Sequence, residues 1–576
     1  MSTAATGLDR MEPPKPVPYA GAQLRNWTDQ ILSAVSLLIV LILVGLPLGA
    51  LLYGSFRTAS PTVAEGSFTL RQWIAVYTTP DFVQPLLNTF IIALPVTLAS
   101  LVVGAGFAWI VARTDTPGKV WLETLLLAPF FLSPFVGAMA WVSLAAPRTG
   151  LLNVFVLGDG RLNVFSPIGV IWVMFLYYAP YAYLFTAGAV RAMDPSLEEA
   201  ARMLRSSTWT ILRRVTLPLI LPALAAAGIL IFILSAEMFS IPGLIGRPAN
   251  FTNLPYRIYY ATRTTPPEWP LAAAAGTVLL WLAVIGVYLN RYLSRQSRRF
   301  ATITGKGYRP RLYRLGPWRW VTFGSILLYV FLAVVLPYAA LTLSSFMKFA
   351  STDIKQSLFT MENYKFLGDP VFRRALVNTT LLGVLSPTAI VLLALIMSYL
   401  INRTKTRGRQ ALDVLGTLPA AIPGIVLGIG MLWAYFKVPL PIFGTLWILV
   451  LAYVAKNLPQ GLRVLNATII QIHQELEESS RMCRANGLQT LARITFPLLR
   501  PSLAYVWILT FIVTVRELSA AVVLYSANSM VIPVLLWDQM ESGNMQAGYA
   551  TAVVQTLMIL AVIVAARYVF RLKFLE

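Results

Sequence analysis

The sequence has little of the chemistry on which most enzymes and metalloproteins depend. Its 576 residues include one cysteine, Cys483, and one histidine, His473. A single cysteine excludes a disulfide within the chain, and together the two residues exclude a metal site built from several Cys or His ligands. We therefore expect no catalytic residue, no bound metal and no cofactor.

A nucleotide-binding loop is missing as well. Such a loop has the pattern G-x-x-x-x-G-K-[ST], in which backbone amides surround the phosphate groups. The two Gly-Lys pairs, at Lys119 and Lys306, are followed by Val120 and Gly307 rather than by Ser or Thr. If ATP drives this protein, the ATPase must be a separate chain.

Charge is scarce, and one sign dominates. Charged residues make up 12% of the chain, and the formal net charge is +22. A typical soluble domain has about twice that charged share. The basic residues lie in short clusters between apolar stretches, not on a face interleaved with exposed aromatic residues. This pattern argues against a nucleic-acid partner.

Long apolar stretches are what the sequence has in abundance, since 57% of its residues are hydrophobic. About 20 apolar residues suffice to cross a bilayer, and lipid requires that they form a helix because it offers the backbone no hydrogen bonds. We predict an all-α polytopic membrane protein with twelve spans, the first of which stays attached. The predicted spans are 31–55, 86–112, 120–146, 167–190, 216–240, 268–291, 320–346, 375–401, 410–436, 444–468, 495–520 and 545–570.

The basic clusters predict an orientation. Cytoplasmic loops of membrane proteins are enriched in Lys and Arg, and most of these residues fall on one side if the N-terminus is inside. The inner set includes the segment from Lys456 to Arg493. One predicted outer loop, 347–374, disagrees because it carries five basic residues. The total number of Lys and Arg residues is larger on the inner side, which predicts that both termini are cytoplasmic.

The chain contains an internal repeat. The segment LLNTFIIAL around Asn88 returns as LVNTTLLGV around Asn378 at an offset of 290 residues, and from Pro180 and Pro459 onward the offset is 279. One insertion of 11 residues in the predicted outer loop 147–166 explains the change, since surface loops tolerate insertions. With six spans per half, both halves enter the bilayer in the same direction, which is a parallel repeat.

The repeat divides the chain into four parts. We expect a cytoplasmic N-terminal tail (1–30), a first half of six spans (31–291), a basic cytoplasmic linker (292–319) and a second half of six spans (320–576). The linker contains glycine and proline, which are typical of connecting segments.

The most specific signal is a matched segment in the predicted inner loop after the fourth span of each half. It reads LEEAARMLRSSTWTILRRVTLPLILPAL from Leu197 and LEESSRMCRANGLQTLARITFPLLRPSL from Leu476. Apolar and small residues recur at helical spacing in both copies, which predicts a short amphipathic helix along the membrane surface. Such a helix could simply rest on the bilayer, but two copies without a gap favour a rigid handle for a peripheral motor.

In these segments the sequence resembles the permeases of binding-protein-dependent ABC importers, and the resemblance covers nearly the whole chain. Their inner loop carries Glu-Ala-Ala, three residues, Gly, nine residues and Ile-x-Leu-Pro. The corresponding positions here are Glu199, Ala200, Ala201, Leu217 and Pro218 in the first copy, and Glu478, Ser479, Ser480, Ile494 and Pro497 in the second. Arg205 and Arg484 replace the family's Gly, which departs from the pattern for the helix-turn-helix bend.

The sequence is most similar to the fused two-half permeases of the ferric-iron type, because VRELSAAVVLYS from Val515 is similar to a signature of that group. The resemblance implies a bacterial inner-membrane protein that works with two ABC ATPase subunits and a solute-binding protein. Import of thiamine, polyamines, phosphonates or sulfate stays open. From other classes, an ion-gradient-driven secondary transporter, which can also have parallel repeats, and a membrane scaffold stay open as well.

Three ionisable residues are candidates for the translocation pathway. One lies near the end of the fifth span of the first half, and two lie near the end of the fifth span of the second half. Glu237 and Glu517 occupy nearly equivalent positions, and Arg516 precedes Glu517. Ionisable groups inside a membrane are costly and are often functional. The alternative is a structural ion pair. Adjacent residues on a helix do not face each other, so the partner of Glu517 would then lie elsewhere than at Arg516.

Overall fold

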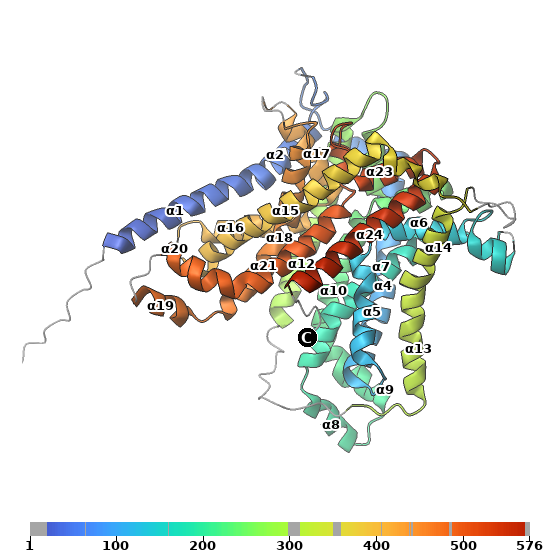
Figure 1. The fold of residues 1–576 in the computed structure, drawn as a ribbon, viewed down its shortest axis with the longest axis horizontal. Coiled ribbons are helices and arrows are strands. Elements are labelled where there is room, and N and C mark those ends of the chain that lie inside the picture. Colours follow the sequence, from blue (N-terminus) through green and yellow to red (C-terminus); the bar gives the residue numbers. More distant parts are fainter. Residues whose placement is uncertain are drawn as a thin grey trace, which may run out of the picture.

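A computed structural model describes residues 20–63, 65–158, 160–297, 312–348, 359–404, 406–436, 438, 442–482 and 487–570. These residues form an assembly of helices that diverges into two arms (Figure 1). The predicted all-α class is confirmed.

The helices follow the same order in each half. The first half comprises α1 (Ala20–Val40), η1 (Leu41–Gly45), α2 (Leu46–Ser55), α3 (Arg71–Thr78), α4 (Pro80–Arg113), α5 (Lys119–Phe131), α6 (Pro134–Ala145), η2 (Asn153–Leu157), α7 (Pro167–Ala192), α8 (Pro195–Met203), α9 (Thr208–Ile211), η3 (Leu212–Thr216), α10 (Leu217–Glu237), η4 (Pro242–Gly246), η5 (Arg247–Ala249), α11 (Leu254–Ala261) and α12 (Trp269–Ser297). The second half comprises α13 (Trp318–Val330), η7 (Phe331–Val335), α14 (Leu336–Ser345), η8 (Glu362–Gly368), α15 (Pro370–Arg403), α16 (Arg409–Thr417), η9 (Leu418–Ala421), α17 (Gly424–Tyr435), α18 (Leu446–Gln471), α19 (Gln474–Met482), α20 (Gly487–Thr490), η10 (Leu491–Thr495), α21 (Phe496–Val515), α22 (Ala521–Leu524), α23 (Ile532–Glu541) and α24 (Met545–Phe570).

Counterparts in the two halves start at the offsets seen in the sequence. Helices α4 and α15 both have 34 residues and start 290 residues apart, while α7 and α18 both have 26 residues and start 279 apart. Arg113 donates to two carbonyl groups at the end of α7, at 2.8 and 2.9 Å. Arg403 makes the same two bonds at the end of α18, at 2.9 and 2.6 Å. The repeat is therefore present in the tertiary contacts as well as in the helix order.

Nine helices within the described residues are long and apolar enough to cross a bilayer. They are Asp29–Ser55, Pro80–Arg113, Pro167–Ala192, Trp209–Glu237, Trp269–Leu293, Trp318–Ser345, Pro370–Arg403, Arg493–Val515 and Met545–Ala565. The predicted spans 120–146 and 410–436 are pairs of helices bent by 93° and 115°, and counting each pair as one span gives eleven. The predicted span 444–468 corresponds to α18, which contains Lys456 and Arg463 and is not among the nine. Twelve spans stay a prediction.

Proline accounts for the two bends. Pro134 is the first residue of α6, and Ser133 before it accepts a hydrogen bond from the amide of Val136 at 3.5 Å. In the second half Pro423 directly precedes Gly424, the first residue of α17. Proline lacks an amide hydrogen and clashes with the preceding turn, so each span breaks at this point. The second helix of each pair is then largely buried in the assembly.

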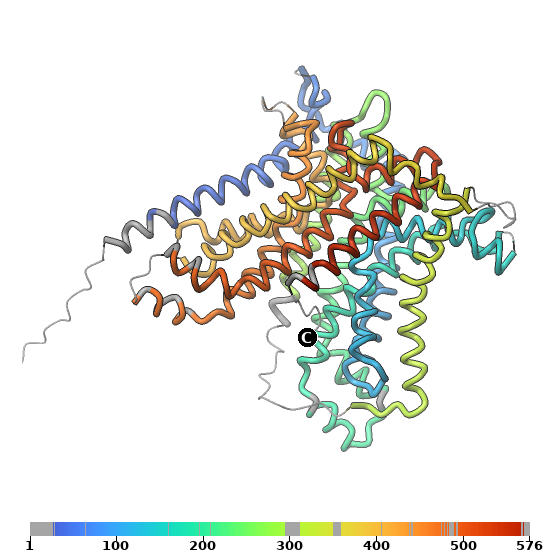
Figure 2. Tube along the Cα trace, viewed as in Figure 1, coloured from blue at the N-terminus to red at the C-terminus, as the bar shows by residue number. Residues whose placement is uncertain are grey.

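The first span of each half packs against the other half. Helix α1 contacts α15 and α16, and α2 contacts α17, whereas α13 contacts α5 and α14 contacts α6 (Figure 2). The hydroxyl of Tyr435 donates to the carbonyl of Ile42 at 2.9 Å, and that of Tyr329 donates to the carbonyl of Leu176 at 2.6 Å. The two halves are therefore interlocked rather than separate bodies.

Helix α4 defines two ends of the molecule. Near its start, the hydroxyl of Thr89 accepts a hydrogen bond from the amide of Leu254 in α11 at 3.0 Å. At its other end, Arg113 contacts the residue Met193 just before α8. Figure 1 shows α8 and α19 well apart at the tips of the two arms. We name this the diverging end, and the opposite end, where α6, α11 and α23 meet, the joined end.

Candidate functional site

The matched segment forms a short helix, a turn and a second short helix in each half. Helices α8 and α19 have nine residues each and lie at the diverging end. Of the predicted site residues, the structure places Glu199, Ala200 and Ala201 in α8, Leu217 and Pro218 at the start of α10, Glu478, Ser479 and Ser480 in α19, Ile494 in η10 and Pro497 in α21. The side chain of Glu478 and all of Arg484 lie outside the described part of the chain.

Two carboxylates fix α8 in place. Asp194 caps the helix by accepting a hydrogen bond from the amide of Ser196 at 2.9 Å, and this bond lowers the pKa of Asp194. Glu198 is buried and accepts a hydrogen bond from the hydroxyl of Thr216 at 2.8 Å, which ties α8 to η3. The carboxylate that anchors this helix is therefore Glu198, one residue before Glu199, which is only partly buried.

Each short helix exposes apolar side chains. Leu197 and Met203 of α8 are 42% and 86% exposed, and their counterparts Leu476 and Met482 of α19 are 45% and 86% exposed. Trp209, just after the first turn, is 70% exposed. Single exposed apolar residues are ordinary, but a group of them marks a contact surface. Both helices therefore expose apolar side chains at the same two positions of the repeat.

Arg205 forms the bend for which the family pattern has Gly. Its φ is +56°, a left-handed conformation that residues other than glycine rarely adopt. The amides of Arg205 and Ser206 donate to the carbonyls of Arg202 and Ala201 at 2.8 and 3.2 Å, which closes the helix. The first half therefore keeps the bend despite the substitution.

The end of the predicted linker contacts α8. The amide of Tyr313 donates to the carbonyl of Arg113 at 2.8 Å, and the amide of Asp115 donates to the carbonyl of Tyr313 at 3.1 Å. The guanidinium carbon of Arg202 in α8 lies 3.7 Å from the centre of the Tyr313 ring, within cation–π range. The connection between the halves is thus in direct contact with one of the two surface helices.

A buried ion pair joins α18 to the end of α21. The Nζ atom of Lys456 lies 2.9 Å from Oε1 of Glu517, and the two side chains are 17% and 10% exposed. The hydroxyl of Tyr453 donates to the backbone carbonyl of Glu517 at 2.9 Å. Gly424 gives the pair room, because a Cβ at that position would lie 2.5 Å from Lys456 Nζ.

This pair settles two expectations about charge. The partner of Glu517 does lie elsewhere than at Arg516, on the neighbouring helix α18. Counting Lys456 in the inner basic segment is wrong, because it lies in the middle of α18 and is largely buried. A lysine in the middle of a predicted span was the signal that could have identified it, since such a charge needs a partner.

Arg516 points away from Glu517 and bonds to the other half. Its Nη1 donates to the carbonyls of Phe130 and Leu132, both at 2.7 Å. These carbonyls lie at the break between α5 and α6, where the helical ladder leaves them without their usual partners. Arg516 is therefore a direct link between the two halves.

Glu237 brings a carboxylate of the first half to the same region. It ends α10, and both Lys456 and Glu517 are close enough to act on its charge. Arg516 is within electrostatic range of Lys456 as well. The structure thus brings the three predicted residues together around Lys456, which the sequence analysis did not single out.

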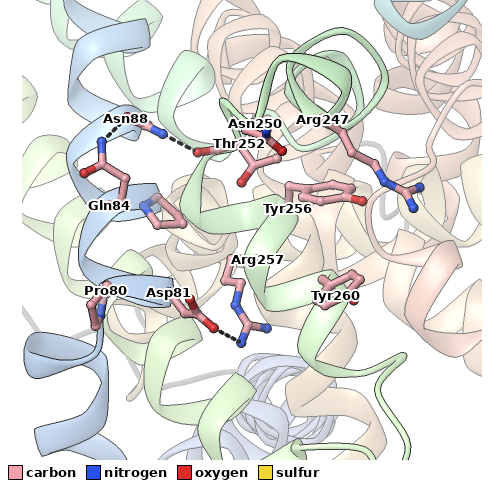
Figure 3. Close-up of a pocket in the computed structure, with 11 residues that line it drawn as sticks. Pro80, Asp81, Gln84, Asn88, Arg247, Asn250, Thr252, Tyr256, Arg257 and Tyr260 are labelled. Atoms are coloured by element: carbon pink, nitrogen blue, oxygen red, sulfur yellow. Dashed lines mark hydrogen bonds and ion pairs between the residues drawn. The ribbon is translucent and has the colours of Figure 1, made fainter.

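A pocket of about 520 Å³ lies at the joined end, lined by the start of α4, by η5 and by α11 (Figure 3). Arg257 in this pocket lies 3.8 Å from Asp81, and Arg247 at its edge lies 3.3 Å from Glu541 of the second half. Among the described residues, His, Cys, Asp and Glu side chains nowhere gather in a group of three that could hold a metal ion.

Interlocked repeats of bilayer-length helices, with matched surface helices and a charged cluster between the halves, define a polytopic membrane permease. The chain belongs to the family described as binding-protein-dependent transport system inner membrane component, which matches residues 20–299 and 390–573. The resemblance to permeases of ABC importers is confirmed, and this chain is a permease component of that kind.

Two permeases are similar to this chain over most of its length, and a third is similar over part of it. It is 26% identical over 541 residues to the ferric transport system permease protein FbpB of Actinobacillus pleuropneumoniae, covering 90% of this chain and 77% of that protein. It is 27% identical over 478 residues to the putative ferric transport system permease protein FbpB 1 of Haemophilus influenzae, covering 81% and 74%. The molybdenum transport system permease protein ModB of Escherichia coli is 30% identical over 230 residues, which is 39% of this chain and 99% of ModB.

Proposed function

We propose that this chain forms the translocation pathway of a ferric-iron importer in a bacterial inner membrane, with both termini and the diverging end in the cytoplasm. The observation that carries the proposal is the pair of matched helices α8 and α19, one at the tip of each arm. Their exposed apolar faces would each receive one ATPase subunit. The joined end would face a solute-binding protein outside.

Force on α8 would reach the membrane through short, stiff contacts. The Glu198–Thr216 hydrogen bond ties α8 to η3, and η3 continues directly into α10. The contact of Arg202 with Tyr313 ties α8 to the end of the linker that leads into the second half. ATP-driven approach of the two motors would draw α8 and α19 together and part the halves at the joined end, so that the pathway changes sides.

The charged cluster lies between the two halves, where such a motion would change the contacts. Glu237 comes from the first half and Lys456 and Glu517 from the second. With one cysteine and one histidine in the chain, a passing ferric ion would meet mainly oxygen groups, which suit a hard cation. The choice of ferric iron rests on the similarity of this chain to the two ferric transport permeases FbpB.

Transport by the reconstituted complex tests the proposal. The full chain, with its ATPase and binding protein in liposomes, should take up radiolabelled ferric iron only when ATP is present on the ATPase side. Thiamine, polyamine, phosphonate, sulfate and molybdate serve as alternative labelled substrates. Uptake driven by an ion gradient without ATP would identify a secondary transporter, and no uptake of any substrate would favour a scaffold.

Sidedness can be measured separately with cysteine labelling. Replacing Cys483 with Ser removes the one cysteine of the chain, and Glu199→Cys and Glu478→Cys are then introduced singly. An impermeant maleimide should label both from the cytoplasmic side. Asp81→Cys at the joined end, where the side chain is 79% exposed, is the control that should label from outside. Labelling of residues 199 and 478 from opposite sides would overturn the proposal.

A further inference from the structure

At the joined end, α11 of the first half meets α23 of the second half directly. The hydroxyl of Tyr259 donates to Oε2 of Glu541 at 3.0 Å, and the indole of Trp537 donates to the Tyr259 hydroxyl at 3.0 Å. The rings of Tyr259 and Trp537 lie 5.6 Å apart at an angle of 88°. Phe239 packs against Trp537 at 4.7 Å, and all three rings are buried. This contact closes the space between the halves with aromatic side chains.

The two residues at its centre are counterparts in the repeat. The amides of Leu254 and Ile532 make the same hydrogen bond to a threonine hydroxyl in α4 or α15, at 3.0 and 2.8 Å. These bonds align the two segments at an offset of 278 residues, so Tyr259 corresponds to Trp537. The same position of the repeat, Tyr259 in the first half and Trp537 in the second, therefore contacts itself across the boundary.

The contacts on either side follow the same relation. At this offset Arg247 corresponds to Tyr525, and Arg263 corresponds to Glu541. The Nη1 atom of Arg247 lies 3.3 Å from Glu541 Oε1, and Arg263 donates to the Tyr525 hydroxyl at 2.7 Å. In an isologous contact, position i of one unit meets position j of the other, and position j of the first unit meets position i of the other. Such contacts are typical of twofold dimers. Here a single chain forms one between its two halves.

Glu541 is the polar centre of this contact. Its carboxylate accepts hydrogen bonds from Arg247 and Tyr259 across the boundary and from Trp537 on its own helix, at 3.0 to 3.3 Å. Burial raises the pKa of Tyr259, so its hydroxyl keeps the proton that it donates. The other flank has no carboxylate, because Arg263 meets a tyrosine there. One acidic residue therefore accepts two of the four hydrogen bonds that the structure describes between the halves at this contact.

We propose that this isologous contact of Tyr259 with Trp537, locked by Arg247 and Glu541, is the gate of the pathway at the joined end. It is closed in the conformation described here, in which the arms diverge at the opposite end. The inference rests on the proposed transport function, because it requires the contact to part when α8 and α19 approach. Hydrogen bonds add little net stability where water can replace them, so a contact of this kind can open reversibly.

A thiol cross-link across the boundary tests the gate in the full complex. In a Cys483→Ser background, Tyr259→Cys and Trp537→Cys are combined and treated with a short bifunctional maleimide, and the cross-linked peptide is quantified by mass spectrometry. We expect efficient cross-linking without nucleotide and a decrease of about tenfold when ATP and vanadate trap the motors together. Glu123→Cys with Arg191→Cys, whose side chains face each other within one half and are partly exposed, should cross-link equally in both states.

The outcomes separate the gate from the transport proposal. Cross-linking that is weak at rest, or that is unchanged by ATP while ATP still drives uptake, would overturn the gate and leave the importer intact. Absence of ATP-dependent uptake by the complex of the unsubstituted chain would instead count against the importer.

Solute leak gives a second reading that needs no motor. Glu541→Gln should raise the passive leak of a small polar dye from liposomes that contain the chain alone, because the carboxylate loses its charge toward Arg247. Asp538→Asn, on the same helix and exposed, is the matched control and should leave the leak unchanged. Equal leak from both variants would also overturn the gate.

Discussion

Lys456 and Glu517 lie 2.9 Å apart, Nζ to Oε1, in the buried interior where the two halves meet. Neither residue could be placed here without the other, since a lone buried charge has no compensation. Glu517 therefore pairs with Lys456 and not with its neighbour Arg516, which donates hydrogen bonds to the first half.

Removing Glu517 should therefore destabilise the fold as well as reduce transport. Glu517→Ala leaves the Lys456 charge buried and should lower the free energy of unfolding by about 3–5 kcal/mol. The double variant Lys456→Met with Glu517→Leu should recover most of this loss. Denaturation in detergent measures both. If the double variant is stable but does not transport, the charges serve the pathway; if it also transports, their role is structural.

Arg516 should contribute to the contact between the halves. Arg516→Leu removes two charge-assisted hydrogen bonds to backbone carbonyls and should cost about 2–4 kcal/mol. Arg500→Leu on the same helix is the control, because Arg500 is exposed and lies over the ring of Phe496 at 5.6 Å. Thermal unfolding of the purified chain measures the difference. Equal losses in the two variants would show that the bonds of Arg516 do not hold the halves together.

Replacing Arg205 with glycine should stabilise the left-handed bend. Arg205→Gly relieves the conformation at φ +56° and should protect the bend by about 1 kcal/mol. Hydrogen exchange at the amides of Leu204 to Ser206 measures this gain. Slower transport by a better-protected variant would indicate that the arginine side chain itself takes part in motor binding. Faster exchange in Arg205→Gly would contradict the strain.

The ring of Tyr313 should matter for coupling, and its hydroxyl should not. Tyr313→Ala removes the surface on which Arg202 stacks and should weaken the position of α8 by about 1–2 kcal/mol. Tyr313→Phe keeps the ring and serves as the control. The measurement is the ratio of ATP hydrolysed to substrate taken up, which should rise for Ala and stay unchanged for Phe.

Acid should loosen α8 through Asp194. Its pKa in the folded chain lies below the ordinary value of about 3.9 because the amide of Ser196 bonds to the carboxylate. The stabilisation is therefore complete above that value and is lost as the pH falls through the folded-state pKa. Hydrogen exchange of α8, corrected for intrinsic rates, should accelerate below pH ~4. Asp194→Asn still caps the helix and should remove this dependence.

The local features of this protein were readable because they depend on neighbouring residues. Apolar runs long enough to span a bilayer must be helical, so most span positions, the offsets of 290 and 279 and the two short helices α8 and α19 followed from the chain. Proline within a span predicts a kink, and the sharp bends at Pro134 and Pro423 agree with that expectation. Several predicted spans contain proline, and only packing decides which of them break.

What the sequence by itself determined is a duplicated set of apolar helices with a matched surface element in each half, because periodicity and hydropathy act over short distances. Only the tertiary structure decided that the first span of each half packs on the other half, that Lys456 is the partner of Glu517, and that Tyr259 meets Trp537. Each of these contacts joins residues far apart in the chain. Shape and charge complementarity in three dimensions select them, and no spacing in the sequence records that selection.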